Sequence, residues 1–324
     1  MKHIKVAIVG GAGYTAGELL RILIHHPYVE IAMVHSKSYA GRPLYAVHKD
    51  LLGDTDLYFT HELPKNWNEI DLLFLCLSQQ ESYQFLAENA LPDSLKIIDL
   101  TQDFRDESRN FVYGLCEANR ERIKQATRIA NPGCFATCIE LALLPLAKKQ
   151  LLQKEVHISG ITGATGAGRQ LSEFQHFSWR NNNVAVYKPF EHQHLAEIRM
   201  VLSQQQGKPI PTLNFIPFRG NFSRGIFATL YTEIDLSLAE VQNIYQECYS
   251  SEPFVHISPQ NLDLKQVIGT NKCFLYLEKF DNKLLIISQI DNLLKGASGQ
   301  AVQNMNLMFG LPETTGLHLK SIAF

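Results

Sequence analysis

The stretch Val6–Leu20, VAIVGGAGYTAGELL, joins a short apolar run to a glycine-rich turn and then to a segment of helical composition. The run Ile4–Val9 indicates a buried strand, Ala16–His25 a helix, and Val29–His35 a second strand. Two strands joined through a helix in this way are parallel, and the crossover between them is right-handed. We therefore predict an α/β fold whose N-terminal part is a Rossmann-type, doubly wound parallel sheet.

Later segments first extend this pattern and then change it. Leu72–Leu77 and Lys96–Leu100 predict further buried strands, with a helix at Glu81–Glu88 between them. After Asn131 the apolar runs mix β-branched, aromatic and polar residues, which predicts an α+β region with a mixed or antiparallel sheet. The elements expected there are a helix at Ala136–Lys149, strands at His157–Thr162, Thr212–Pro217 and Ile226–Ile234, a hairpin of Lys272–Glu278 with Lys283–Ile290, and a last helix near Ala297–Phe309.

The composition is that of a globular chain with two domains. The 324 residues are 45% hydrophobic and carry a formal net charge of −2, which gives no electrostatic argument for nucleic acid. No run approaches the roughly 18 apolar residues that span a bilayer. The N-terminal MKHIKVAIVGG lacks the pattern of a signal peptide, and six scattered cysteines suit reduced thiols. We expect a cytoplasmic protein that binds neither nucleic acid nor membrane.

The glycine turn has the features of a dinucleotide site. Gly10, Gly13 and Ala16 lie between a strand and a helix, where small residues let the backbone approach a pyrophosphate. The helix N-terminus adds N–H groups and a favourable dipole. The alternative, a tight turn that holds no ligand, fits less well because the strand, the helix and the next strand are all present.

The end of the second predicted strand selects between the two nicotinamide cofactors. NAD-selective folds usually carry an acidic residue there, which binds the ribose. This chain has His35-Ser36-Lys37-Ser38, and its Glu30 lies at the opposite end of the strand. Because hydroxyls and a cation suit a 2′-phosphate, we predict NADP.

The tetrapeptide Asn131-Pro132-Gly133-Cys134 puts a thiol where a predicted helix begins. The helix dipole and the backbone N–H groups stabilise a thiolate at that position, so Cys134 is a candidate nucleophile. The alternative is a buried structural cysteine, and we expect that role for Cys138, one helical turn further on.

The segment Glu191-His192-Gln193-His194 supplies candidate acid–base groups. In a helix that starts here, His194 and Glu197 share one face, and the carboxylate can orient the imidazole beside a catalytic thiol. The His-x-His spacing also occurs in metal sites, but no third strong ligand lies nearby, and we predict no metal. The spacing leaves open whether His192 or His194 faces the sulfur, and also whether both lie on a solvated loop.

Together these motifs resemble the N-acetyl-γ-glutamyl-phosphate reductase family, relatives of the aspartate-semialdehyde and glyceraldehyde-phosphate dehydrogenases. The resemblance extends over Val9–Met308, nearly the whole chain, and its most specific parts are NPGC and DNLLKGASGQAVQNMN. The matching stretches are VGGAGYTAGELLRIL, IDLTQDFR, NPGCFATCIELALLPL, TGATGAGR, EHQHLAEI, SRGI and DNLLKGASGQAVQNMNLM.

The resemblance implies a reaction and a set of site residues. Cys134 would displace phosphate from an acyl phosphate and form a thioester, NADPH would reduce the thioester to an aldehyde, and a histidine would serve as acid–base group. We favour His194, because Glu197 can orient it. The expected catalytic residues are Cys134, His194, His192 and Glu197. The expected substrate contacts are Arg105, Asn131, Arg169 and Arg219. The alternative for Arg105 and Arg169 is an ordinary surface arginine. The expected cofactor contacts are Gly10, Gly13, Tyr14, Thr15, Ala16, Ser36, Lys37, Ser38, Ser78, Gly166 and Asn292.

The resemblance also implies domains and assembly. In the related families the closing helix packs on the cofactor domain. We therefore expect an NADP-binding Rossmann domain of residues 1–133 with 297–324, and a catalytic and oligomerisation domain of residues 134–296. The habit of the family suggests a homodimer or homotetramer.

One segment departs from the family pattern. Many members have roughly PHLVPMNRG where Pro217–Gly225 has PFRGNFSRG, so Phe218 replaces a histidine and Arg219 is an added cation. Our hypothesis is that Arg219 recognises a second carboxylate, as in an N-succinyl rather than an N-acetyl substrate. The alternative is a salt bridge or a subunit contact.

Two other functions stay open at the level of sequence. One is a semialdehyde dehydrogenase for another acyl phosphate, of the aspartyl or aminoadipyl type, in which only the pocket would differ. The other is a non-catalytic, NADP-binding regulatory protein, which would need neither Cys134 nor the histidine pair.

Overall fold

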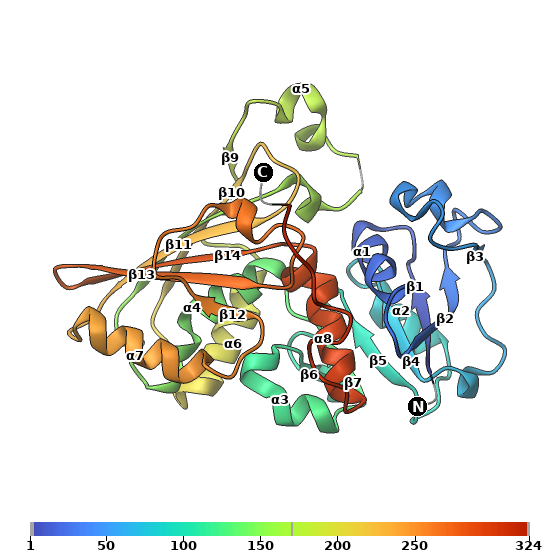
Figure 1. The fold of residues 1–324 in the computed structure, drawn as a ribbon, viewed down its shortest axis with the longest axis horizontal. Coiled ribbons are helices and arrows are strands. Elements are labelled where there is room, and N and C mark those ends of the chain that lie inside the picture. The colour runs from blue at the N-terminus through green and yellow to red at the C-terminus, as the bar shows by residue number, and fades with distance from the viewer. Residues whose placement is uncertain (1–2, 170, 323–324) are drawn as a thin grey trace. The chain divides into compact units, whose positions relative to one another are not determined.

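A computed structural model describes residues 3–169 and 171–322 (Figure 1). Its contacts divide the chain into two compact units. The first contains the residues up to Pro132 together with Ala297–His318, and the second contains Gly133–Gly296. The described residues from Leu319 onward group with the second unit, although we expected them in the first.

The first unit is built on a seven-stranded sheet with the order β3-β2-β1-β4-β5-β7-β6. Every pairing between its strands is parallel. The strands are β1 Ile4–Val9, β2 Val29–His35, β3 Phe59–Thr60, β4 Leu72–Leu75, β5 Lys96–Asp99, β6 Val112–Tyr113 and β7 Arg128–Ala130, and the helices are α1 Tyr14–Leu23, α2 Glu81–Glu88, α3 Cys116–Gln125 and α8 Gly299–Met308. The first five strands have the order of a Rossmann sheet, which confirms the predicted fold class.

The central strands of this sheet are apolar on both faces. Every residue of β4 is fully buried, and Val6–Val9 of β1 are at most 1% exposed. Strands of a parallel sheet that is covered by helices on both sides have this continuous apolar pattern. The carboxyl ends of β1 and β2 are therefore rigidly held, and the glycine turn and the Ser36–Ser38 segment follow them.

The second unit contains a mixed seven-stranded sheet with the order β12-β13-β14-β11-β8-β10-β9. Two pairings, β8 with β10 and β12 with β13, are parallel, and the others are antiparallel. The strands are β8 Val156–Thr162, β9 Ala185–Val186, β10 Leu213–Arg219, β11 Ile226–Glu233, β12 Val255–Ile257, β13 Cys273–Phe280 and β14 Lys283–Ile290, and the helices are α4 Cys134–Lys148, α5 Phe177–Arg180, α6 His194–Gln206 and α7 Leu238–Tyr249. The predicted mixed or antiparallel sheet is confirmed.

Helix α4 is the buried centre of the second unit. Its residues 135–147 are all buried, and it packs on α6, α7, β11 and β14 (Figure 1). The hydroxyl groups of Tyr245 and Tyr249 donate to the carbonyls of Ala142 and Leu141, at 2.5 and 2.6 Å. Because it is held from several sides, α4 is a rigid support for the residue at its N-terminus.

The strand predictions agree with the structure more closely than the helix ends do. β1, β2, β14 and α2 have the predicted bounds. α4 begins at Cys134 rather than at Ala136, because Gly133 is its N-cap with extended φ and ψ of −70° and 149°. The predicted last helix is preceded by a π-helical turn, Leu294–Ser298, so α8 begins only at Gly299.

In the part of the chain that the structure describes, no helix has the length and apolar character needed to cross a membrane.

Candidate active site

The glycine turn after β1 is shaped by close backbone contacts. Gly10 has a φ of 85°, and a Cβ on it would lie 2.3 Å from the Cys76 carbonyl oxygen. This position therefore requires glycine. Gly13 is the N-cap of α1, and Tyr14, Thr15 and Ala16 form its first turn. The turn thus brings a glycine backbone and a helix N-terminus together, as pyrophosphate binding requires.

A histidine that sequence reasoning did not single out supports this turn. The His48 Nε2 atom lies 2.7 Å from the Gly11 carbonyl oxygen, and a Cβ on Gly17 would lie 2.6 Å from the His48 ring. His48 therefore fills the space that Gly17 leaves. Glycine at position 17 is the only sequence signal of this packing.

The other predicted cofactor contacts of the first unit lie at the ends of β2 and β4. Ser36 is buried, and its N–H donates to the Thr60 carbonyl at 3.1 Å. Lys37 and Ser38 are exposed. Ser78 is also exposed and begins the approach to α2, where its N–H donates to Glu81 at 2.9 Å.

Cys134 is the first residue of α4 and is half-buried. The first N–H groups of a helix have no partner within the helix, and together with the dipole they favour a negative charge at this end. Cys138 is fully buried, and its thiol donates to Ser288 Oγ at 3.2 Å. Burial raises the pKa of Cys138, so it remains a thiol.

Glu197 links the histidine segment to the cysteine segment. It lies in the first turn of α6, is 5% exposed, and accepts a hydrogen bond from the Gly133 N–H at 3.0 Å. Its other carboxylate oxygen lies 3.9 Å from His194 Nε2. One buried carboxylate therefore contacts the peptide before Cys134 and also faces His194, the first residue of the same helix.

His192 and His194 have different environments. The His192 ring packs edge-on against Phe135, Tyr187 and Phe215, with centroid distances of 5.5, 5.6 and 5.4 Å. Its Nδ1 accepts a hydrogen bond from the His194 N–H at 3.2 Å. Burial, followed by the charge of His194, lowers the pKa of His192 to about 3. His192 is therefore neutral at ordinary pH, and it holds the backbone of His194.

Arg105 and Asn131 meet within the first unit. Arg105 Nε donates to the Asn131 carbonyl at 2.9 Å. The Asn131 side chain donates to the Ala297 carbonyl at 3.0 Å and accepts from Asn304 at 3.2 Å. These contacts anchor the segment that leads to Cys134, and both ends of the Asn131 amide take part in them.

The TGATGAGR segment is tied to the strands beside it. Asn292 donates to Thr165 Oγ1 at 3.0 Å and accepts from the Gly225 N–H at 2.7 Å. Gly166 lies in the 3₁₀ turn Ala164–Ala167 and is exposed, and a Cβ on it would lie 3.8 Å from the Asn292 amide nitrogen. Asn292 therefore braces the loop that carries Gly166.

The two remaining predicted arginines differ in exposure. Arg169 is exposed at the end of the same loop. Arg219 is half-buried at the end of β10, with its guanidinium 4.2 Å from the Tyr187 ring centroid and 5.2 Å from that of Phe174.

Two further features of the second unit were not predicted from the sequence. Arg224 forms a two-point ion pair with the fully buried Asp291, at 3.1 and 3.0 Å, and this pair secures the segment after β14. In that segment a Cβ on Gly296 would lie 2.8 Å from Cys134 Cβ. Both lie in stretches that carried the family resemblance, but spacing along the chain does not reveal their contacts.

Among residues 3–169 and 171–322, no group of three His, Cys, Asp or Glu side chains is arranged to hold a metal ion. The His192 and His194 rings lie 4.6 Å apart, with His192 against Phe135 and His194 3.9 Å from Glu197.

Two family models match the chain. The model described as semialdehyde dehydrogenase, NAD binding domain, matches residues 5–126. The model described as semialdehyde dehydrogenase, dimerisation domain, matches residues 134–292. A nicotinamide cofactor is therefore a property of the family.

Curated relatives match over almost the full length. An N-acetyl-gamma-glutamyl-phosphate reductase of Parabacteroides distasonis is 56% identical, covering 99% of this chain and 100% of the relative. Proteins of the same name from Phocaeicola vulgatus and Flavobacterium johnsoniae are 54% and 56% identical, each covering 99% of this chain and 100% of the relative.

Solved structures agree on the fold. Aspartate semialdehyde dehydrogenase II of Vibrio cholerae, in complex with ASA, has a TM-score of 0.77 at 14% identity, covering 96% of this chain and 99% of that one. Aspartate semialdehyde dehydrogenase of Candida albicans, with NADP, has a TM-score of 0.69 at 14% identity, covering 95% and 99%. The fold is thus that of the semialdehyde dehydrogenases, and the sequence similarity over nearly the whole chain shows that this protein belongs to the N-acetyl-gamma-glutamyl-phosphate reductase family.

Proposed function

We propose that the chain catalyses the NADPH-dependent reduction of an N-acyl-γ-glutamyl phosphate to the N-acylglutamate 5-semialdehyde, with release of phosphate, in arginine biosynthesis. The acyl group is acetyl or succinyl. The observation that carries the proposal is the position of Cys134 at the N-terminus of α4, next to a peptide held by Glu197, which also faces His194. The names of the relatives at 54–56% identity support the same reaction.

Cys134 is the nucleophile in this proposal. Its thiolate forms a C–S bond with the γ-carbonyl carbon, and the bond from that carbon to the phosphate oxygen breaks, so that inorganic phosphate leaves. N–H groups at the start of α4 stabilise the negative charge on sulfur before the attack. A bound reduced nicotinamide supplies the hydride that converts the thioester to the aldehyde.

His194 is the proposed acid–base group. It takes the thiol proton from Cys134 and returns a proton to the sulfur when the aldehyde forms. The Glu197 carboxylate lies 3.9 Å from His194 Nε2, where it orients the imidazole. His192 is a positioning residue, because its low pKa keeps it neutral and its Nδ1 holds the His194 N–H.

The residues after β1 and β2 fit a dinucleotide. Gly10 has no side chain at the point where the chain turns, so a ligand can approach its backbone closely. Gly13 is the N-cap of α1, and the first turn of that helix consists of Tyr14, Thr15 and Ala16. We propose that these residues hold the pyrophosphate and that Ser36, Lys37 and Ser38 hold the 2′-phosphate of NADP. Ser78, Gly166 and Asn292 are proposed as further cofactor contacts.

The anionic parts of the substrate require cations. We propose that Arg169 and Arg105 hold the leaving phosphate or the substrate carboxylate, and that Asn131 orients the segment before Cys134. For Arg105 and Asn131, the hydrogen bonds to backbone carbonyls support a contribution through positioning. Arg219 is proposed as a contact to the acyl group.

The assembly proposed is a homodimer or homotetramer in the cytoplasm. The second unit matches a model described as a dimerisation domain, and Tyr231, on the face of its sheet away from α4, is 45% exposed. All six cysteines are thiols, which suits a reducing compartment.

The test runs the reaction in reverse. Reduction of NADP is measured with N-acetyl- and N-succinylglutamate 5-semialdehyde, with and without phosphate, for the wild type and Cys134→Ala. We expect activity that requires phosphate and disappears in the variant. The semialdehydes of aspartate and aminoadipate serve as controls. A preference for either would show that the enzyme acts on that semialdehyde instead. Folded protein that binds NADPH, shows no activity with any aldehyde and has an unreactive Cys134 would indicate a regulatory protein.

A further inference from the structure

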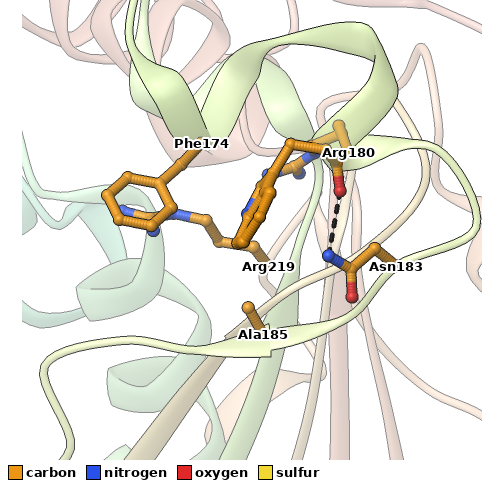
Figure 2. Close-up of a pocket in the computed structure, with 6 residues that line it drawn as sticks. Phe174, Arg180, Asn183, Ala185 and Arg219 are labelled. Carbon is orange, nitrogen blue, oxygen red and sulfur yellow. Dashed lines mark hydrogen bonds between the residues drawn. The ribbon is translucent and has the colours of Figure 1, made fainter.

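Two arginines share a small pocket in the second unit. The pocket is a narrow, half-open recess, and the figure of about 230 Å³ for its empty space includes open solvent. It is lined by Phe174, Trp179, Arg180, Asn183, Ala185 and Arg219. Figure 2 shows Arg219 reaching toward the Phe174 ring, with Arg180 on the adjacent wall. The pocket therefore combines two guanidinium groups with aromatic and methyl surfaces.

The two charges are close together and lack an acidic partner among the described residues. Burial and the neighbouring Arg219 charge lower the pKa of Arg180. Arg180 Nη2 donates to the Gly220 carbonyl at 2.7 Å, and its Nε is buried without a partner. Within the described part of the chain, no carboxylate lies within 4.0 Å of either guanidinium. Two half-buried like charges without a counter-ion are costly, and an anionic ligand offsets the cost.

Stacking orients Arg219 for such a ligand. Its guanidinium lies 4.2 Å from the Tyr187 ring centroid and 5.2 Å from that of Phe174. Aromatic faces hold the plane of a guanidinium while its N–H groups point outward from the edge of that plane, where a carboxylate accepts two of them.

Tyr187 connects this pocket to Cys134. Burial and the negative charge of Cys134 raise the pKa of Tyr187, and the charges of Arg219 and Arg180 oppose that effect. The Tyr187 ring is also the ring on which the Arg219 guanidinium lies, at 4.2 Å from the centroid. Its ring also packs on His192, at 5.6 Å between centroids. The His192 ring in turn packs on Phe135, the residue after Cys134, at 5.5 Å, so ring contacts within the second unit connect the pocket with the cysteine segment.

The position of the pocket relative to Cys134 indicates which anionic group of the substrate it could bind. The phosphate is bonded to the carbon that Cys134 attacks, so it must lie beside the sulfur. A carboxylate at the end of an acyl chain lies further away and is preceded by methylene groups, for which Phe174, Trp179 and Ala185 provide apolar walls. An acetyl group has neither the charge nor the methylene groups.

Resting on the proposed function, we propose that Arg180 and Arg219 bind the terminal carboxylate of a dicarboxylic N-acyl group, of the succinyl class, and so determine the acyl specificity of this enzyme.

The experiment measures kcat/KM for the phosphate-dependent reduction of NADP with N-succinyl- and N-acetylglutamate 5-semialdehyde. The variants are Arg219→Met and Arg180→Met, with Arg199→Met on the exposed face of α6 as the matched control. We expect the wild type to prefer the succinyl substrate. Each pocket variant should lose about 10- to 100-fold more with that substrate than with the acetyl substrate, mainly through KM. Arg199→Met should leave both unchanged.

Other outcomes overturn the proposal. A wild-type preference for the acetyl substrate would do so. Equal losses with both substrates would assign the arginines to the α-carboxylate, which both substrates share, and a rise in the KM of phosphate alone would assign them to phosphate.

Calorimetry with the unreactive N-succinyl- and N-acetylglutamate separates this proposal from the proposed function. Tighter binding of the succinyl compound that is lost in Arg219→Met supports the pocket even if the wild type reduces neither aldehyde. Equal binding of the two compounds would overturn the pocket even if the enzyme is active.

Discussion

The Glu197 carboxylate accepts a hydrogen bond from the Gly133 N–H at 3.0 Å, across 64 residues of sequence. Its second oxygen lies 3.9 Å from His194 Nε2. One buried side chain therefore contacts both the peptide before the thiol and the ring proposed to exchange its proton. Glu197 therefore has two roles, as the acceptor for the Gly133 N–H and as the negative charge beside His194, and two different substitutions can test them separately.

Glu197→Gln should retain an acceptor for Gly133 but remove the charge beside His194. We expect kcat to fall about 10- to 100-fold, because the negative charge beside the proposed acid–base group is lost. The loss of stability should be small, because the hydrogen bond from the Gly133 N–H is retained. Glu197→Leu removes both contacts and should also lower the free energy of unfolding by about 1–3 kcal/mol. Rates and thermal unfolding are measured beside Glu191→Gln, whose side chain is exposed. An unchanged rate in Glu197→Gln would exclude an electrostatic role.

The low pKa of His192 predicts acid sensitivity. Its folded-state pKa of about 3 is below the value of about 6.5 for an unfolded chain. The unfolded state therefore binds the proton first, and stability is lost as the pH falls from about 6.5 toward 3. His192→Asn keeps an acceptor for the His194 N–H but does not titrate, so its free energy of unfolding should fall less between about pH 7 and pH 5. The control is His176→Asn, on the exposed surface. Equal pH slopes in His192→Asn and wild type would contradict a buried neutral imidazole.

Gly296 leaves the space that Cys134 occupies. The Cβ of Gly296→Ala would lie 2.8 Å from Cys134 Cβ, so the cysteine or the π-helical turn must shift. We expect kcat to fall about 10- to 100-fold, since small misplacements of a catalytic group cost that much. Iodoacetamide modification of Cys134 should change in rate, whereas NADPH affinity should not. Full activity in a folded Gly296→Ala protein would mean that the π-helical turn shifts to accommodate the methyl group and that Cys134 keeps its position.

His48 and Gly17 should be energetically coupled. A methyl group on Gly17 would lie 2.6 Å from the His48 ring, which also approaches the Gly11 carbonyl at 2.7 Å. Gly17→Ala should therefore weaken NADPH binding by displacing His48 from the turn. Adding His48→Ala removes the clash, so the double variant should bind better than the sum of the two single losses predicts. Additive losses in NADPH affinity, measured by fluorescence titration, would show that the contact does not shape the turn.

Lys37 tests the cofactor assignment. Lys37→Met should weaken NADPH binding about 10-fold and leave NADH binding nearly unchanged, because only NADPH carries the 2′-phosphate. Raising the salt concentration should reduce the difference between wild type and variant. Lys49→Met, another exposed lysine of the first unit, is the control. Equal use of NADH and NADPH by the wild type would remove the basis for NADP.

The sequence by itself determined the features that depend on neighbouring residues. β1, the glycine turn and β2 follow from apolar runs and glycine within one short unit. The sequence also predicted α4, but it placed the start at Ala136 rather than at Cys134. These signals are local, because backbone conformation and burial periodicity are decided over a few residues. The family resemblance then assigned chemistry to Cys134.

Only the tertiary structure decided which distant side chains meet. Glu197 with Gly133, Asp291 with Arg224 and Arg219 with Tyr187 join positions whose separation carries no pattern. The structure also distinguished His192 from His194, which are close in sequence and differ through the ring packing around His192. Such contacts depend on how helices pack on a sheet and on strand register. Both are determined by the complete fold, so local sequence patterns do not predict them.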